Sequence, residues 1–238
     1  MHVTRKSSML GCMRIRVYST FVLALLSAAA VLHAGEADNR RLEESASMFK
    51  EIMDTPDHSV PRDLLKSAQC AVLMPGTKKA GFILGAKYGR GFATCRTSKG
   101  WSAPVAMRIE GGSVGFQIGA SETDIILLIM NKRGMDRLLS SKFTLGGEAS
   151  VAAGPVGRDS QAQTDITMRA EILAWSRSRG AFAGIALQGA TLRADSDTDK
   201  DLYGKSVSRA DVLNGLVPVP PPAANLVNTM TRYAGVGK

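Results

Sequence analysis

A serine in a glycine-rich run matches a spacing that is used in nucleophilic catalysis. Gly111-Gly112-Ser113-Val114-Gly115 has the Gly-x-Ser-x-Gly order of the serine-hydrolase nucleophile elbow. That chemistry needs a histidine to take the serine proton, and in such folds the histidine follows the serine in the chain. His2, His33 and His58 all precede the serine. The residues after the serine have the pattern of a strand, whereas the elbow leads into a helix. A serine hydrolase is therefore the weakest of three functions that we consider.

Two further motifs lack the groups that their chemistry requires. The run 76–81 begins like a phosphate-binding loop, but Phe82 follows where lysine and a hydroxyl residue should stand. The run 195–201 alternates aspartates as a calcium loop does, yet Lys200 and Ser206 occupy the positions of the required glycine and glutamate. We expect a turn between strands and a solvated turn leading into a helix, respectively. One histidine and two cysteines in the mature chain are too few for zinc, so we predict no metal and no cofactor.

The N-terminal residues have the pattern of an export signal. Arg14 and Arg16 precede an apolar run over 17–32, and small residues follow it. The run is short for a membrane span and is followed by polar sequence, so we expect a cleaved signal peptide over 1–34 instead of a retained anchor. We predict a periplasmic or secreted protein associated with a membrane, and we exclude nucleic acid as a partner.

The predicted signal peptide also changes the charge of the mature chain. It contains four basic residues and no acidic one, so its removal lowers the net charge from +9 to +5. A modest positive excess suits an acidic membrane surface.

Cys70 and Cys95 form an even pair of cysteines in a chain that we expect to be exported. Exported compartments are oxidising, which favours a disulfide between the two residues. Two buried free thiols are the alternative, because unpaired cysteine is often a core residue.

Basic residues cluster in the first half of the strand-rich region, beside a tryptophan. They are Lys78, Lys79, Lys87, Arg90, Arg96 and Lys99, with Trp101 next to them. Cations can bind lipid phosphates while an indole ring prefers the membrane interface. An ordinary solvated face would have the same composition, and the residues alone do not separate the two interpretations.

Three helices and a series of short strands are expected to position these residues. Apolar residues at helical spacing predict an amphipathic helix over 40–54, and proline at an N-terminal position predicts a second helix over 61–68. A third is expected over 131–140. The strands are expected over 71–74, 81–87, 91–96, 105–109, 113–120, 124–130, 148–153, 168–175 and 182–192, with a turn at 88–90.

The strands are short, rich in glycine and separated mostly by turns. This pattern indicates an α+β fold with a curled, mostly antiparallel β-sheet and short flanking helices. The apolar run 125–130 must be buried on both faces of the sheet. The proline-rich run 217–222 predicts an extended linker before a short helical end.

Eight short blocks in a fixed order carry a resemblance to a known family. They are Lys79-Ala80-Gly81-Phe82, Tyr88-Gly89-Arg90-Gly91, Gly100-Trp101-Ser102-Ala103-Pro104, Gly115-Phe116-Gln117-Ile118-Gly119, Leu145-Gly146-Gly147, Ala153-Gly154-Pro155-Val156-Gly157-Arg158, Phe182-Ala183-Gly184 and Tyr203-Gly204. Together they strongly resemble the SYLF domain, over about residues 60–210. We therefore expect a signal peptide over 1–34, a helical segment over 35–60, a SYLF-like domain over 61–214 and a proline-rich tail over 215–238.

The resemblance implies a non-enzymatic module that binds acidic phospholipids. Eukaryotic members bind phosphoinositides, and some bind actin, but they use a basic leading helix and additional domains that this sequence lacks. We therefore expect only general affinity for anionic phospholipid at a membrane surface of the cell envelope. Headgroup contacts are predicted for Lys78, Lys79, Lys87, Arg90 and Arg158, with Trp101 as the interfacial anchor. The alternative is a protein-interaction or scaffolding domain with incidental lipid affinity.

Overall fold

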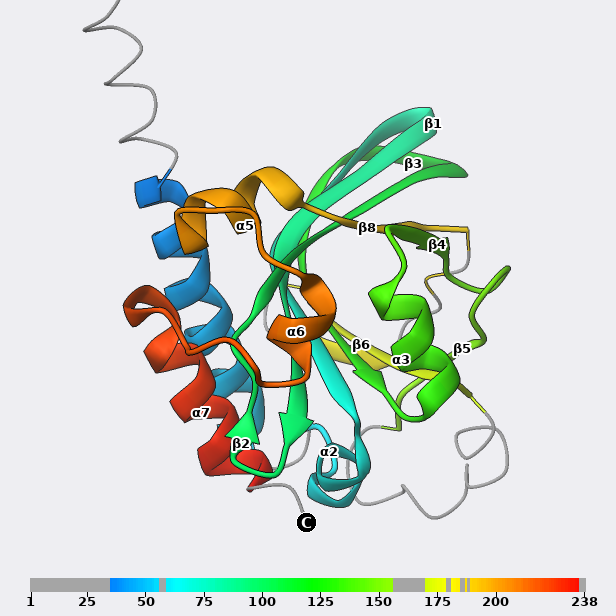
Figure 1. Cartoon of the computed structure of the whole chain (residues 1–238). Coiled ribbons are helices and arrows are strands. Elements are labelled where there is room, and N and C mark those ends of the chain that lie inside the picture. Colours follow the sequence, from blue (N-terminus) through cyan, green and yellow to red (C-terminus); the bar gives the residue numbers. More distant parts are fainter. Residues whose placement is uncertain are drawn as a thin grey trace, which may run out of the picture. The chain divides into compact units, whose positions relative to one another are not determined.

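The computed structural model describes residues 35–55, 59–155, 170–178, 181–184, 187 and 189–235 (Figure 1). The predicted signal peptide and Arg158 lie outside these residues. Contacts divide the chain into units 1–38 and 39–238, and the second unit contains all of the strands named here.

The predicted N-terminal helices are confirmed. One helix covers 35–54, and its apolar residues at helical spacing, among them Leu42, Phe49 and Met53, are buried. The second, α2, covers Arg62–Ser67 and begins directly after Pro61, which is its N-cap residue. Both helices form because one face of each supplies apolar side chains to the core.

Two long strands, β1 (Cys70–Thr97) and β3 (Val105–Ile129), dominate the sheet. They pair antiparallel from Cys70–Ile129 to Ala93–Val105, and in Figure 1 they run side by side. The predicted turn at 88–90 is wrong, because Tyr88 and Arg90 pair in register with residues of β3. Glycine allows a strand to bend sharply without ending it, so several predicted short strands are parts of one long strand.

β1 folds back so that its two ends meet. A Cβ atom on Gly91 would lie 2.0 Å from the carbonyl oxygen of Leu73, so only glycine permits this crossing. The predicted disulfide is confirmed: Cys70 and Cys95 are bonded, and both are buried. We refer to the outward part of the β1–β3 ladder, residues 77–88 and 110–123, as the arm.

Six shorter strands complete the sheet. They are β2 (Gly100–Trp101), β4 (Lys142–Thr144), β5 (Val151–Ala153), β6 (Ile172–Ser178), β7 (Ala181–Gly184) and β8 (Thr191–Ala194). Their pairings are antiparallel except for the parallel pair β5–β6. With the short helices that flank it, this curled and mostly antiparallel sheet confirms the predicted α+β class.

The sheet is buried on both faces over its central part. Ile126 and Leu128 pack in one core with the 35–54 helix, while Ile125, Leu127 and Ile129 pack in a second core on the opposite face. The prediction for this apolar run is confirmed for residues 125–129. The remaining helices are α3 (Lys132–Leu139), α5 (Ser196–Tyr203), α6 (Arg209–Leu213), the 3-10 helix η2 (Pro221–Ala223) and α7 (Ala224–Ala234).

The C-terminal helix is part of the first core. Leu226 and Met230 of α7 are buried there, and α7 lies beside the 35–54 helix in Figure 1. The proline-rich segment therefore leads into an element that completes the fold. Among the described residues, no helix combines the length and the apolar character needed to cross a membrane.

Candidate functional site

Three of the predicted headgroup ligands lie on the arm, and it brings two of them together. Lys78 is exposed, while Lys79 and Lys87 are partly exposed. Burial, and then the positive charge of Lys79, lower the pKa of Lys87. The two residues are eight positions apart in the sequence, but the folding back of β1 places their charges within interaction range. Two like charges, those of Lys79 and Lys87, thus lie together on the arm, while Lys78 pairs across the strands with the acidic Glu122.

The other predicted ligands have different positions. The guanidinium of Arg90 is ion-paired with Asp195, with Nε and Oδ2 3.1 Å apart, and the Asp195 side chain is only 3% exposed. Trp101 is 4% exposed and belongs to the first core. A buried ring cannot insert between headgroups, so the structure does not place Trp101 where an interfacial anchor would have to be.

Arg96 lies over the ring of the buried Trp101. Its guanidinium lies 4.8 Å from the Trp101 ring centroid and donates to carbonyl oxygens at the C-terminal ends of two helices. These acceptors are Leu65 and Ala68 at the end of α2, and Ala234 and Gly235 at the end of α7. Because helix C-termini carry partial negative charge, a cation between them is favourable. Arg96 therefore joins α2, α7 and β1, which is a structural role.

A second group of basic residues crosses four strands, and of its members the sequence interpretation identified Arg90 alone. Arg90 pairs with Arg108, Arg108 with Arg193, and Arg193 with Lys142, each as direct cross-strand neighbours. We call Arg90, Arg108, Arg193 and Lys142 the basic row. Glu110 is ion-paired with two of them, at 3.4 Å from Nε of Arg108 and 3.2 Å from Nη1 of Arg193. These residues are far apart in the sequence, and only the strand register brings them together.

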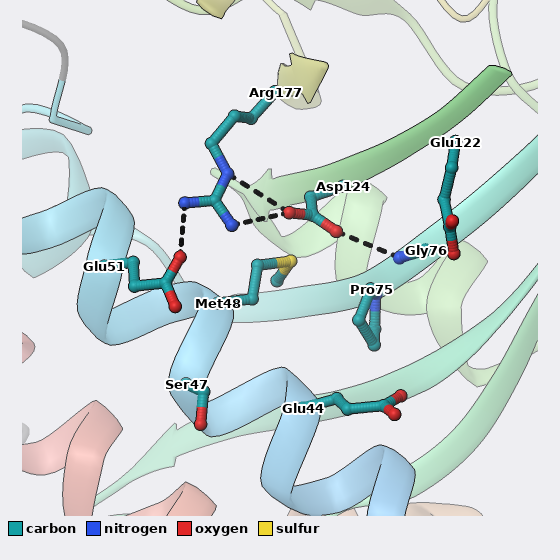
Figure 2. A pocket seen from close by; sticks show the side chains of 9 residues that line it. All are labelled: Glu44, Ser47, Met48, Glu51, Pro75, Gly76, Glu122, Asp124 and Arg177. Atoms are coloured by element: carbon teal, nitrogen blue, oxygen red, sulfur yellow. Dashed lines mark hydrogen bonds and ion pairs between the residues drawn. The ribbon is translucent and has the colours of Figure 1, made fainter. Parts of the chain in front are cut away.

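A cleft of about 590 Å³ lies between the 35–54 helix, β1, β3 and β6 (Figure 2). Arg177 donates to Asp124 Oδ2 at 2.7 and 3.1 Å and to Glu51 at 2.8 Å, while the other oxygen of Asp124 accepts from Gly76 N at 2.9 Å. Two further lining residues, Glu44 and Glu122, are also acidic. One arginine among four carboxylates leaves the cleft negative, which disfavours a lipid phosphate there.

Two of the four aspartates in the run 195–201, Asp195 and Asp199, are buried where the sequence suggested a solvated turn. Asp199 of α5 accepts a hydrogen bond from Ala106 N at 2.6 Å, and its Oδ2 lies 3.6 Å from Nη1 of Arg209. Burial raises the pKa of Asp199 to about 6. Asp195 is buried against Arg90. The prediction of a solvated turn is wrong for both residues, because Asp195 pairs with Arg90 of β1 and Asp199 is held by Ala106 N of β3 and by Arg209. Among the described residues, no group of three metal-ligating side chains forms.

Ser113 does not stand at a nucleophile elbow. It lies within β3, where its backbone pairs with Gly85 of β1. The sharp turn from strand to helix that exposes a catalytic serine is therefore missing at this position.

Comparisons with known proteins agree on one family. A family model described as "Ysc84: Las17-binding protein actin regulator" matches residues 110–233, which is more than half of the chain. The protein named "SH3 domain-containing YSC84-like protein 1" is 32% identical in Rattus norvegicus over 180 residues, and 33% identical in Xenopus laevis over 181 residues. "Protein YSC84" of Saccharomyces cerevisiae is 32% identical over 183 residues.

These matches cover 75% of this chain but only 53%, 54% and 39%, respectively, of the relatives. The chain thus spans about half, or less, of the length of these relatives. The resemblance to the SYLF domain is confirmed, and the matched region includes most of β3, much of the second core and α7. The chain belongs to the Ysc84 (SYLF) family.

Proposed function

We propose that this protein is a non-enzymatic module that is exported and then binds peripherally to membranes that contain anionic phospholipid. The observation that carries the proposal is the pair of like charges on the arm, Lys79 and Lys87, with the exposed Lys78 on the same segment. Keeping lysines close together costs free energy through repulsion, and anionic headgroups would offset that repulsion. The family description names binding and regulation and no reaction, which supports a binding role.

Salt should distinguish this mode of binding from apolar insertion. Contacts between exposed charges and headgroups are screened over about 8 Å at physiological ionic strength. The purified chain should therefore sediment with vesicles that contain phosphatidylglycerol, less so at high salt, and not with phosphatidylcholine alone. Sedimentation that is equal for both vesicles, or insensitive to salt, would contradict the proposal.

The contribution of the arm can be measured with the double variant Lys78→Glu/Lys79→Glu. Each basic residue near an anionic membrane contributes about 1 kcal/mol, so the loss of two should weaken binding by about 25-fold or more. Lys66→Glu/Lys99→Glu is the matched control, because both lysines are exposed and lie on α2 and on the turn before β2, away from the arm (Figure 1). Equal losses in both double variants would mean that only net charge matters.

A second candidate function is protein binding. It is favoured by the family description, which names Las17 binding and actin regulation for the family. Because the chain spans only about half of its relatives, partners of the relatives need not bind this region. Sedimentation of the purified chain with actin filaments in the absence of vesicles, with no response to lipid, would support this alternative and contradict the first.

A further inference from the structure

We propose that the protein contacts the membrane with one particular face of its sheet, and that the basic row and Tyr88 form this contact. This inference rests on the proposed lipid binding and specifies the surface that performs it. It does not use the lysines of the arm, and Arg90 is the one predicted headgroup ligand that belongs to it.

Strand register places the basic row on one face. Direct cross-strand neighbours in antiparallel strands have side chains on the same side of the sheet. Arg90, Arg108, Arg193 and Lys142 are such neighbours across β1, β3, β8 and β4. With about 4.8 Å between adjacent strands, the row is about 14 Å long.

The alternating burial of these strands shows that this face is the exposed one. Met107, Ile109, Leu192 and Phe143 are next to members of the row in sequence and are buried in the second core. Their neighbours in the row remain accessible: the side chains of Arg193, Arg90 and Arg108 are 43%, 35% and 30% exposed, and Lys142 is exposed.

The four basic side chains of the row form three ion pairs with two carboxylates among the described residues. Glu110 is shared by Arg108 and Arg193, and Asp195 is paired with Arg90. Among the ion pairs of the described residues, two carboxylates thus face a row of four basic side chains. Like charges directly opposite one another destabilise a sheet, so an anionic partner would relieve a cost that the fold itself carries. Arginine can also bind phosphate oxygens with two hydrogen bonds at once.

Tyr88 makes a membrane surface the better partner than an acidic protein segment. It pairs with Glu110 and lies two residues before Arg90, so it belongs to the same face. Its side chain is 46% exposed, and Tyr88 and Leu216 are the large hydrophobic residues that are exposed in the described part of the chain. A tyrosine beside basic residues suits the interface, where the ring meets the headgroup region and the cations meet phosphate.

Fluorescence of a tryptophan at position 88 tests whether this face meets lipid. The natural tryptophans, Trp101 and Trp175, are buried, so they should respond little to vesicles. Full-length protein carrying Tyr88→Trp should show a blue shift with phosphatidylglycerol vesicles and quenching by brominated lipid. Leu216→Trp, at a residue that is 74% exposed outside this face, is the matched control and should show neither response. Equal responses at both positions, or none at position 88, would overturn the inference.

Neutralising the row tests its charges. Lys142→Gln/Arg193→Gln should weaken binding to the same vesicles by roughly 25-fold, at about fivefold for each charge. Lys66→Gln/Lys99→Gln, which removes the same net charge outside the row, should bind nearly as the wild type does. Unchanged thermal unfolding of both variants would show that the fold is intact.

The possible failures are distinguishable. A wild-type protein that binds no anionic vesicle refutes the proposed function and this inference together. If the wild type binds, but the row variant binds equally well or Tyr88→Trp gives no fluorescence response, the inference alone is overturned and the lysines of the arm are left as the contact. In that case Glu110 and Asp195 would make the row only a set of cross-strand ion pairs.

Discussion

Loss of the Cys70–Cys95 disulfide should destabilise the fold substantially. The bond connects residues 25 positions apart and joins the start of β1 to its end. Closing a loop of this length in the unfolded chain corresponds to about 3.5 kcal/mol of stabilisation at 25 °C in the chain-entropy model. For a domain of this size, that is a fall in Tm of about 7–14 °C.

Thermal unfolding of the wild type and of Cys70→Ala/Cys95→Ala, followed by circular dichroism, measures this effect. In the presence of a reductant, the Tm of the wild type should fall toward that of the variant, because reduction removes the same constraint without removing the sulfur atoms. Any additional loss in the variant reports the small cavities that alanine leaves in the core. A variant that melts within about 2 °C of the wild type, with the disulfide of the latter verified by mass spectrometry, would refute the reasoning, since even a weak constraint should shift Tm by more.

Three further substitutions test other parts of the fold, each by chemical denaturation. Arg96→Lys should lower the free energy of unfolding by about 2 kcal/mol, because one ammonium cannot replace a planar guanidinium that donates to the ends of α2 and α7. An unchanged free energy of unfolding would contradict this role. Gly91→Ala should lower the free energy of unfolding by about 3 kcal/mol, since the alanine methyl group would meet the Leu73 carbonyl oxygen at 2.0 Å. An unchanged denaturation midpoint would show that β1 does not cross itself there. Protonation of Asp199 favours the folded state because its pKa is raised from 3.8 to about 6, so its contribution is greatest below about pH 4 and is lost as the pH rises through about 6. The free energy of unfolding of Asp199→Asn should therefore rise relative to that of the wild type by up to about 3 kcal/mol between about pH 4 and pH 7. A stability difference between the two proteins that does not change with pH would contradict the raised pKa of Asp199.

Local patterns predicted the helices well and the strands only in part. The helix predicted over 40–54 follows from apolar periodicity, which depends on neighbours in the chain, and it forms part of the observed 35–54 helix. Near residues 88–90 and 113–124, separate short strands were predicted where the structure has the continuous strands β1 and β3, because glycine is as compatible with a bend within a strand as with a turn between strands. Which of the two occurs depends on pairing with β3, and pairing is not encoded in the residue types of one segment.

The candidate site, too, could be predicted from the sequence only in part. Residue types indicated a basic region, and the fold brings two of its lysines, Lys79 and Lys87, together on the arm. They could not reveal that Trp101 is beneath Arg96, since the helix ends that hold Arg96 come from distant parts of the chain. Exposure depends on such long-range contacts, and it decides whether an aromatic residue can meet lipid at all.

Composition and local pattern thus establish the fold class, the helices, the cysteine pair and the family of this protein. These properties follow from short-range periodicity, from the chemistry of two thiols and from ordered sequence blocks. The register of β1, β3, β8 and β4 brings Arg90, Arg108, Arg193 and Lys142 into one row. A shift of one residue in any of these strands would turn its member of the row toward the core. Only the folded chain fixes that register, because it is the arrangement that buries the apolar residues on the opposite face.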